Sequence, residues 1–254
     1  MINGRTLVLC LIAALIGQCT ISAPGLQYTD ADKRILSKPI PFGSNRRQLT
    51  LSYIRRHYDP RAVDICIVPE MIVIHWTGSP SLNSALHEFH ADEVSESRRE
   101  LVRAGAVNVS AQFMVDRDGS IYQLMPAKFM ARHTIGLNPV AIGIENVGDG
   151  GNHPLTADQL QANVWLVKYL KATYPGIHYL IGHNEYLRFR GTPLWREKDP
   201  KYFDRKPDPG SEFINSLRAK VRPLQLAEAF DGYRLPDSHD GHFSCDQDSG
   251  TARQ

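Results

Sequence analysis

The clearest apolar pattern in the chain is a short continuous run that leads into a histidine. Residues Met71–Ile74 are all apolar, and His75 follows them directly. A continuous apolar run of this length is typical of a buried strand. We expect one or two strand segments over 65–74, broken at Pro69, that carry His75 out of the core. A rigid strand end holds an imidazole in a fixed orientation, as a metal ligand requires.

A second pattern predicts a β-hairpin further along the chain. Apolar residues alternate over 109–115, and a returning strand is expected over 120–125. The segment Asp116–Gly119 between them forms the turn, because an Asp-Gly pair adopts positive φ at low cost.

Other segments predict strands and helices in alternation. Apolar runs predict strands over 140–147 and 178–182, and helical periodicity predicts helices over 83–105, 156–174 and 211–220. The second helix begins with Thr156 and Gln159 at the spacing of a capping box. The first helix is expected to turn Leu86, Phe89, His90 and Val94 inward. Strands alternating with helices, plus one hairpin, predict an α/β fold: a single domain with a mixed β-sheet flanked by helices.

The composition narrows the class of protein. The chain has 254 residues, of which 42% are hydrophobic and 22% charged, so it can bury a core as one domain with extensions. Its formal net charge of +2 gives no argument for a nucleic-acid partner. Ten histidines are enough to justify a search for metal sites.

The two ends of the chain differ in composition from the middle. Arg5 precedes an apolar run over 6–17 that is too short to span a bilayer but suits a secretory signal, although a buried N-terminal helix would have the same pattern. We therefore divide the chain into a signal peptide (1–23), an N-terminal lead-in (24–64), the folded domain (65–222) and a polar, loose C-terminal tail (223–254). The protein is expected to be exported, to the periplasm or the extracellular space.

The cysteines bear on that location. Lipidation at Cys19 would make the protein an outer-membrane lipoprotein, and this is the only route to the membrane that we expect. In an oxidising compartment, Cys66 and Cys245 either form a disulfide or remain two separate thiols.

Three residues suit a hydrolytic zinc site. Such a site takes three ligands from histidine and carboxylate and leaves one position for water. His75 and His183 both follow apolar strands, so neighbouring strands would bring them to one edge of the sheet. Asp208, held between two prolines, is the best third ligand. By contrast, His87 and His90 are one residue short of the helical HExxH zinc motif.

Five sequence blocks together resemble a known family, the zinc-dependent N-acetylmuramoyl-L-alanine amidases. This family shares its fold with the peptidoglycan-recognition proteins and the phage T7-type lysozyme. The resemblance covers about 65–222. The blocks, in order, are IVIHWTG, VSAQFMVDRDGSIYQL, RHTIGLNPVAIGIEN, LIGH and RKPDPG.

The resemblance implies a role for each matching residue. His75, His183 and Asp208 would bind one zinc ion per chain, and Glu145 and Lys206 would be catalytic. Glu145 would move the proton of the attacking water, and Lys206 would stabilise the oxyanion. His133 matches a histidine that lines the family's groove without binding the metal, and we assign it to substrate binding with Trp76. The implied substrate is peptidoglycan or a muropeptide.

One departure from the family leaves alternatives open. The interval between His183 and Asp208 is longer than in many members, and the extra segment 184–204 carries several aromatic residues. These could stack on sugar rings or pack on the domain, and Asp199 or Asp204 becomes a rival third ligand. Two rival functions also remain: a peptidoglycan-binding module that does not cut, and a zinc peptidase acting on another amide.

Overall fold

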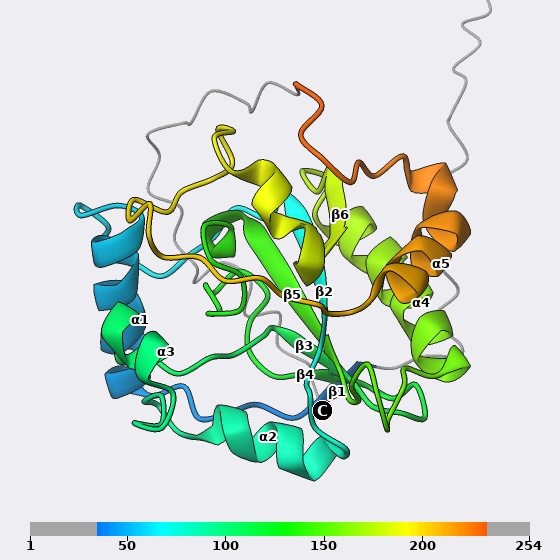
Figure 1. The fold of residues 1–254 in the computed structure, drawn as a ribbon, viewed down its shortest axis with the longest axis horizontal. Helices are drawn as coiled ribbons and strands as arrows, with labels where there is room; N and C mark the ends of the chain where they lie inside the picture. The colour runs from blue at the N-terminus through cyan, green and yellow to red at the C-terminus, as the bar shows by residue number, and fades with distance from the viewer. Residues whose placement is uncertain (1–34, 233–254) are drawn as a thin grey trace, which may run out of the picture.

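A six-stranded mixed sheet forms the centre of the computed structural model, which describes residues 35–232 (Figure 1). The strand order is β1-β4-β3-β5-β2-β6. Strands β3, β5, β2 and β6 run parallel, β4 is antiparallel to β3, and β1 is parallel to β4. The strands are β1 (Ile35–Ser37), β2 (Met71–Trp76), β3 (Phe113–Val115), β4 (Ile121–Gln123), β5 (Ala141–Asn146) and β6 (Tyr179–Gly182).

Helices lie on both sides of this sheet, with α4 and α5 together on one side and α1, α2 and α3 on the other (Figure 1). The predicted single-domain α/β fold is confirmed. The α-helices are α1 (Ser44–His57), α2 (Leu82–His90), α3 (Arg99–Ala104), α4 (Ala157–Thr173) and α5 (Ser211–Val221). Three 3-10 helices complete the set: η1 (Asn138–Val140), η2 (His183–Phe189) and η3 (Arg222–Leu224).

The alternation of side chains along β2, β5 and β6 decides what each face of the sheet carries. Even-numbered residues such as Ile72, Ile144 and Leu180 pack in one core with the buried residues of α4 and α5. Odd-numbered residues point to the opposite face, because successive side chains in a strand alternate. Since His75 pairs in register with Glu145, these two polar side chains share that opposite face at the C-terminal ends of their strands.

Several local predictions are confirmed. β3 and β4 form the antiparallel hairpin, closed by the Asp116–Gly119 turn, in which the Gly119 amide donates to the Asp116 carbonyl. Thr156 caps α4: its hydroxyl accepts from the Gln159 amide, and the Gln159 side chain accepts from the Thr156 amide. The predicted helix 211–220 corresponds to α5.

The single helix predicted over 83–105 was wrong, because the structure has two helices there, α2 and α3. The Asn108 side-chain amide donates to the carbonyls of Glu88 and Ala91, which ends α2. The Val94 amide then donates to the Ala106 carbonyl, so the link between the helices pairs with the chain that follows α3. His90, predicted to face inward, is exposed.

The lead-in and the tail contain structure that the sequence pattern did not indicate. Within 24–64, β1 extends the sheet, and α1 buries Tyr53 and Ile54 against the rest of the domain. In the tail, predicted to be loose, Ala227 pairs with the edge strand β6 through hydrogen bonds to His178 and Leu180. The predicted signal over 1–23, Cys19 and the possible pairing with Cys245 lie outside the described residues.

No helix within 35–232 combines the length and the apolar character that crossing a bilayer requires.

Candidate metal centre

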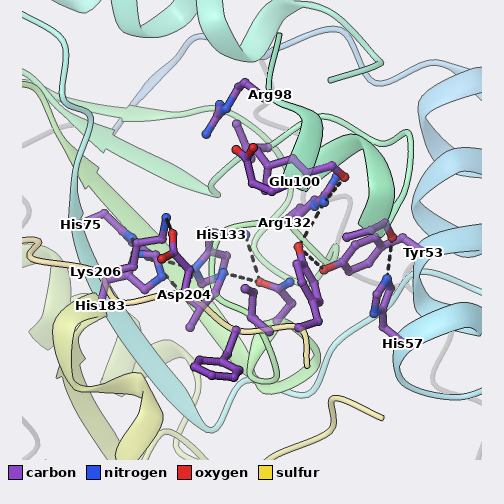
Figure 2. Close-up of a pocket in the computed structure, with 18 of the residues that line it drawn as sticks. Tyr53, His57, His75, Arg98, Glu100, Arg132, His133, His183, Asp204 and Lys206 are labelled. Carbon is purple, nitrogen blue, oxygen red and sulfur yellow. Dashed lines mark hydrogen bonds and ion pairs between the residues drawn. The ribbon is translucent and has the colours of Figure 1, made fainter. Parts of the chain in front are cut away.

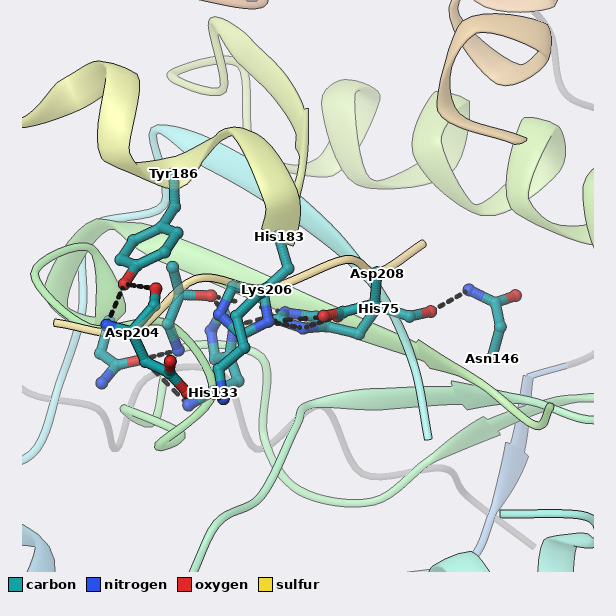
Figure 3. A network of polar contacts seen from close by, with 10 residues as sticks. His75, His133, Asn146, His183, Tyr186, Asp204, Lys206 and Asp208 are labelled. Atoms are coloured by element: carbon teal, nitrogen blue, oxygen red, sulfur yellow. Dashed lines mark hydrogen bonds and ion pairs between the residues drawn. The ribbon is translucent and has the colours of Figure 1, made fainter. Parts of the chain in front are cut away.

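Two histidines and one aspartate converge at the C-terminal end of the parallel strands (Figure 3). The Nδ1 atoms of His75 and His183 lie 3.0 Å apart, and each lies 3.1 Å from Oδ2 of Asp208. All three residues are buried. They are the three residues that the sequence predicted as ligands, and they form the only group within residues 35–232 that could hold a metal ion.

The sheet register explains why the two histidines meet. β2 and β6 are parallel neighbours whose last paired residues are Ile74 and Gly182. His75 and His183 each follow one of these residues, so they occupy equivalent positions at adjoining strand ends. An Asn146 side chain on β5 donates to the His75 carbonyl at 3.0 Å and so fixes the backbone of the first ligand.

Asp208 reaches the histidines because its loop passes close over the end of β6. The Asn184 amide donates to the Asp208 carbonyl at 2.8 Å. Gly182 permits this approach: a Cβ atom there would lie 2.8 Å from Cδ of Pro209. The loop is therefore hydrogen-bonded to the residue after His183 and lies close to the residue before it.

Burial and mutual contact set the protonation states of this group. Burial and, to a smaller extent, the neighbouring His183 lower the pKa of His75 to about 4, against the opposing effect of Asp208. Burial alone would raise the pKa of Asp208, but its contacts with His183 and His75 outweigh that effect and hold the pKa well below its usual range. Asp208 is therefore ionised and His75 neutral at neutral pH, which are the forms that bind metals.

The donor set fits a metal ion such as zinc. Zinc prefers histidine nitrogen and carboxylate oxygen, and in a tetrahedral site with bonds of 2.0–2.1 Å neighbouring ligand atoms are about 3.3 Å apart. The three separations of 3.0–3.1 Å are close to that value. Three ligands also leave one position for water or substrate, as in catalytic rather than structural zinc sites.

Glu145 lies on the same sheet face as His75, to which it is paired in register. Its Oε2 atom is buried and has no hydrogen-bond partner within residues 35–232. Burial raises the pKa of Glu145 well above its ordinary value, and the nearby Asp208 and Glu88 carboxylates add to the effect. A carboxyl oxygen that is buried without a partner costs free energy, so its presence on the same sheet face as His75 favours a role in proton transfer.

Lys206 lines the same groove, and its Nζ atom lies 2.7 Å from Oδ2 of Asp204 (Figures 2 and 3). Asp204, the rival third ligand, is therefore paired with Lys206 and lies outside the group formed by His75, His183 and Asp208. Asp199 is likewise outside the metal-binding group and is exposed.

His133 and Trp76, assigned to substrate binding from the sequence, both line the groove. The His133 ring contacts His75 at the ring nitrogen that does not face Asp208: Nδ1 of His133 lies 3.0 Å from Nε2 of His75. Trp76 packs beside two glycine-containing loops, since Cβ atoms at Gly150 and Gly210 would meet its ring. The exposed His87 and His90 of α2 are not part of the metal-binding group.

The groove has a volume of about 780 Å³ and extends well beyond the ligands. Figure 2 shows the metal end around His75 and His183 and, opposite it, a far end around Tyr53, His57 and Arg132. Sequence reasoning missed these three residues. The first two lie on α1, in the segment expected to be a lead-in, and no local motif marks them.

The extra segment 184–204 forms one wall of this groove. Most of its aromatic residues pack on the domain rather than line the groove, because Tyr186 and Phe189 are buried beside β2 and β6 and Trp195 stacks on Tyr186. Tyr202 and Phe203 do line the groove, and Phe203 is 46% exposed. The segment is therefore mainly a packed wall with one exposed aromatic ring.

Comparison with known proteins gives a family and a set of similar folds. No curated protein matches the sequence. One similar solved structure is the N-acetylmuramoyl-L-alanine amidase LysCS from Clostridium intestinale, with 20% identity, 74% of this chain and 95% of that chain covered, and a TM-score of 0.49. A second is a Se-Met derivative of AmpD, with 22% identity, 75% of this chain and 93% of that chain covered, and a TM-score of 0.44. A third is human PGRP-IBETAC in complex with glycosamyl muramyl pentapeptide, with 17% identity, 61% of this chain and 84% of that chain covered, and a TM-score of 0.43.

The family model described as N-acetylmuramoyl-L-alanine amidase matches residues 67–211, which is more than half of the sequence. The matched range includes His75, His183 and Asp208, which lie together in the structure, and Glu145 on the same sheet face as His75. The chain therefore belongs to the N-acetylmuramoyl-L-alanine amidase family.

Proposed function

We propose that this protein is a zinc-dependent N-acetylmuramoyl-L-alanine amidase. It hydrolyses the amide bond between the lactyl group of N-acetylmuramic acid and L-alanine, in peptidoglycan or in muropeptides. The observation that carries the proposal is the buried triangle of His75, His183 and Asp208 in a groove that Glu145 also lines, the buried Oε2 of Glu145 having no hydrogen-bond partner within residues 35–232.

One zinc ion per chain would be held by Nδ1 of His75, Nδ1 of His183 and Oδ2 of Asp208. When bound, zinc lowers the pKa of a coordinated water to about 7 and polarises a carbonyl oxygen. The groove supplies the remaining requirement, a concave surface in which the substrate can be oriented.

Glu145 acts as the general base and then as the general acid. Its free Oε2 accepts the proton of the attacking water and passes that proton to the nitrogen of the leaving L-alanine. Burial raises the pKa of Glu145, which makes the protonated form accessible for the second half of this transfer.

Lys206 stabilises the negative charge that develops on the carbonyl oxygen. An ammonium group in the groove can donate to that oxygen, and one well-placed donor is worth on the order of 3 kcal/mol in the transition state. In the resting structure its Nζ is bound to Asp204, whose side chain is 60% exposed and can exchange this contact for water when Lys206 turns to the substrate.

The proposed substrate also bears on where the protein works. Peptidoglycan lies outside the cytoplasmic membrane, in line with the export signal expected over 1–23. We therefore place the protein in the periplasm or the extracellular space, as a lipoprotein if Cys19 is acylated, and fractionation of cells tests this location directly.

Product analysis tests the function. Purified peptidoglycan and a soluble muropeptide are incubated with the zinc-loaded protein, and the products are identified by mass spectrometry. We expect peptides with a new amino group on L-alanine and glycan that keeps its lactyl carboxylate. New amino ends at other residues would indicate a peptidase instead, and binding without any product would indicate a peptidoglycan-binding module. Either result would contradict the proposal.

A further inference from the structure

We propose that His133 is a positioning residue: it holds His75 in the tautomer with the proton on Nε2, which leaves the Nδ1 lone pair of His75 free for the metal. The inference rests on the proposed metal site and assigns His133 a role different from substrate binding. It follows from a chain of contacts that runs from the metal site into the sheet.

The two nitrogens of the His75 ring face different partners. Nδ1 points into the triangle with His183 and Asp208, whereas Nε2 lies 3.0 Å from Nδ1 of His133. The two rings are nearly perpendicular, at 87°, with centroids 5.1 Å apart. A neutral imidazole carries one proton, so whichever nitrogen of His75 donates a hydrogen bond leaves the other as an acceptor.

The contact between His133 and Ala141 decides which partner donates in each of these hydrogen bonds. Nε2 of His133 lies 3.3 Å from the carbonyl oxygen of Ala141, and a carbonyl oxygen can only accept. The proton of His133 is therefore on Nε2, and its Nδ1 is an acceptor. Nε2 of His75 donates to that acceptor, so Nδ1 of His75 carries no proton. Ala141 thus sets the tautomer of the metal ligand through two rings.

Thr134 provides a second acceptor for the same proton. Its hydroxyl oxygen lies 2.9 Å from Nδ1 of His133 and 3.4 Å from Nε2 of His75. A hydroxyl can donate to the first nitrogen while accepting from the second. Both routes place the proton of His75 on Nε2, so they reinforce one tautomer.

The surrounding structure holds the His133 ring in this place. A Cβ atom at Gly143 would lie 2.9 Å from Cγ and Nδ1 of His133, so glycine leaves the space that the ring occupies. The Asn138 side-chain oxygen accepts from the amides of His133 and Thr134, at 3.0 and 2.7 Å. Partners that orient a metal-bound histidine typically change metal affinity by 10- to 100-fold when they are removed.

Zinc affinity measured by competition with a chelator tests the inference without relying on activity. We expect His133→Leu, which removes the acceptor, to raise the Kd for zinc about 10- to 100-fold. His133→Asn keeps a side-chain oxygen near the position of Nδ1, so its Kd should stay within a few-fold of the wild type. Equal weakening in both variants, or an unchanged Kd in His133→Leu, would overturn the proposal.

Nitrogen NMR of the histidine rings provides a second test that needs no variant. In the wild-type protein without metal and with one equivalent of zinc, we expect the proton on Nε2 for both His75 and His133. A proton on Nδ1 of His133 would overturn the relay even if zinc binds. If the wild type binds no zinc at all, the proposed function fails instead, so the two failures are distinguishable.

Discussion

The two ends of the groove are built in different ways. At the metal end, His75 and His183 occupy equivalent positions at the ends of adjoining parallel strands, and the register of the sheet brings them together. At the far end, α1, α3 and the segment 184–204 meet through polar side chains. His57 lies 2.9 Å from Glu197, and its other ring nitrogen contacts the Ala104 carbonyl at 2.6 Å.

The far end also depends on one buried arginine. Arg132 donates to the carbonyls of Leu101, Gly105 and Val107 and to the Tyr202 hydroxyl. These contacts join the wall segment to α3 and to the chain beside the metal site. The comparison indicates that the chemistry depends on sheet register, whereas the shape of the groove depends on side-chain contacts between distant segments. We therefore expect the chemistry at the metal end to survive changes to the side-chain contacts that shape the groove.

The largest expected effect comes from removing the carboxylate ligand. Asp208→Ala leaves two histidine ligands, so we expect zinc binding below one equivalent and cleavage of peptidoglycan at background. Metal content of the purified protein and muropeptide release are the measurements. Asp199→Ala, in the wall segment, is the matched control and should keep both properties. A full equivalent of zinc in Asp208→Ala would remove this residue from the site.

Glu145→Gln separates metal binding from proton transfer. The amide cannot accept the proton, so we expect zinc to be retained while kcat falls about 10²- to 10⁴-fold. Zinc content and steady-state rates on a soluble muropeptide measure the two properties. Near-normal kcat in this variant would show that another group carries the proton.

We expect Glu197→Leu to destabilise the far end of the groove without affecting the metal end. It leaves the buried His57 without its carboxylate partner, and a buried polar group without a partner costs about 1–3 kcal/mol. We expect a lower free energy of unfolding in urea with an unchanged Kd for zinc. The exposed Glu96→Gln serves as the control for loss of one acidic charge. A large change in zinc affinity would contradict the independence of the two ends.

The smallest expected effect concerns pH and Glu70. Burial raises the pKa of Glu70 to about 7, against the opposing charge of Arg196 in the wall segment. Because the folded state holds this proton more tightly than the unfolded state, folding stability falls as pH rises from about 4.5 to 7. The contribution is under about 1 kcal/mol, since the side chain is only partly buried and the charge is screened.

Glu70→Gln tests this sign. The difference in free energy of unfolding between the variant and the wild type should grow in favour of the variant between pH 5 and pH 8, within the range set by the pKa of about 7. A difference that stays constant over this range, or one that moves the opposite way, would contradict the assignment.

Sequence reasoning reached the metal end because that end is encoded locally. The apolar run before His75, the hairpin and the capping box of Thr156 are all short-range signals, and the resemblance supplied Glu145 and Lys206. It missed the far end because Tyr53, His57 and Arg132 meet only after α1, α3 and the wall segment have packed. The break between α2 and α3 depends on Asn108, a residue beyond the predicted helix, so periodicity within 83–105 could not indicate it.

X-ray absorption at the zinc edge of the zinc-loaded protein tests the central claim most directly. The account predicts one zinc ion bound by two imidazoles and one carboxylate oxygen at about 2.0–2.1 Å, with one further light atom and no sulfur. In His183→Ala the signal of one imidazole should be lost. A shell of six oxygens, or a spectrum that His183→Ala leaves unchanged, would contradict the claim that His75, His183 and Asp208 form a single zinc site.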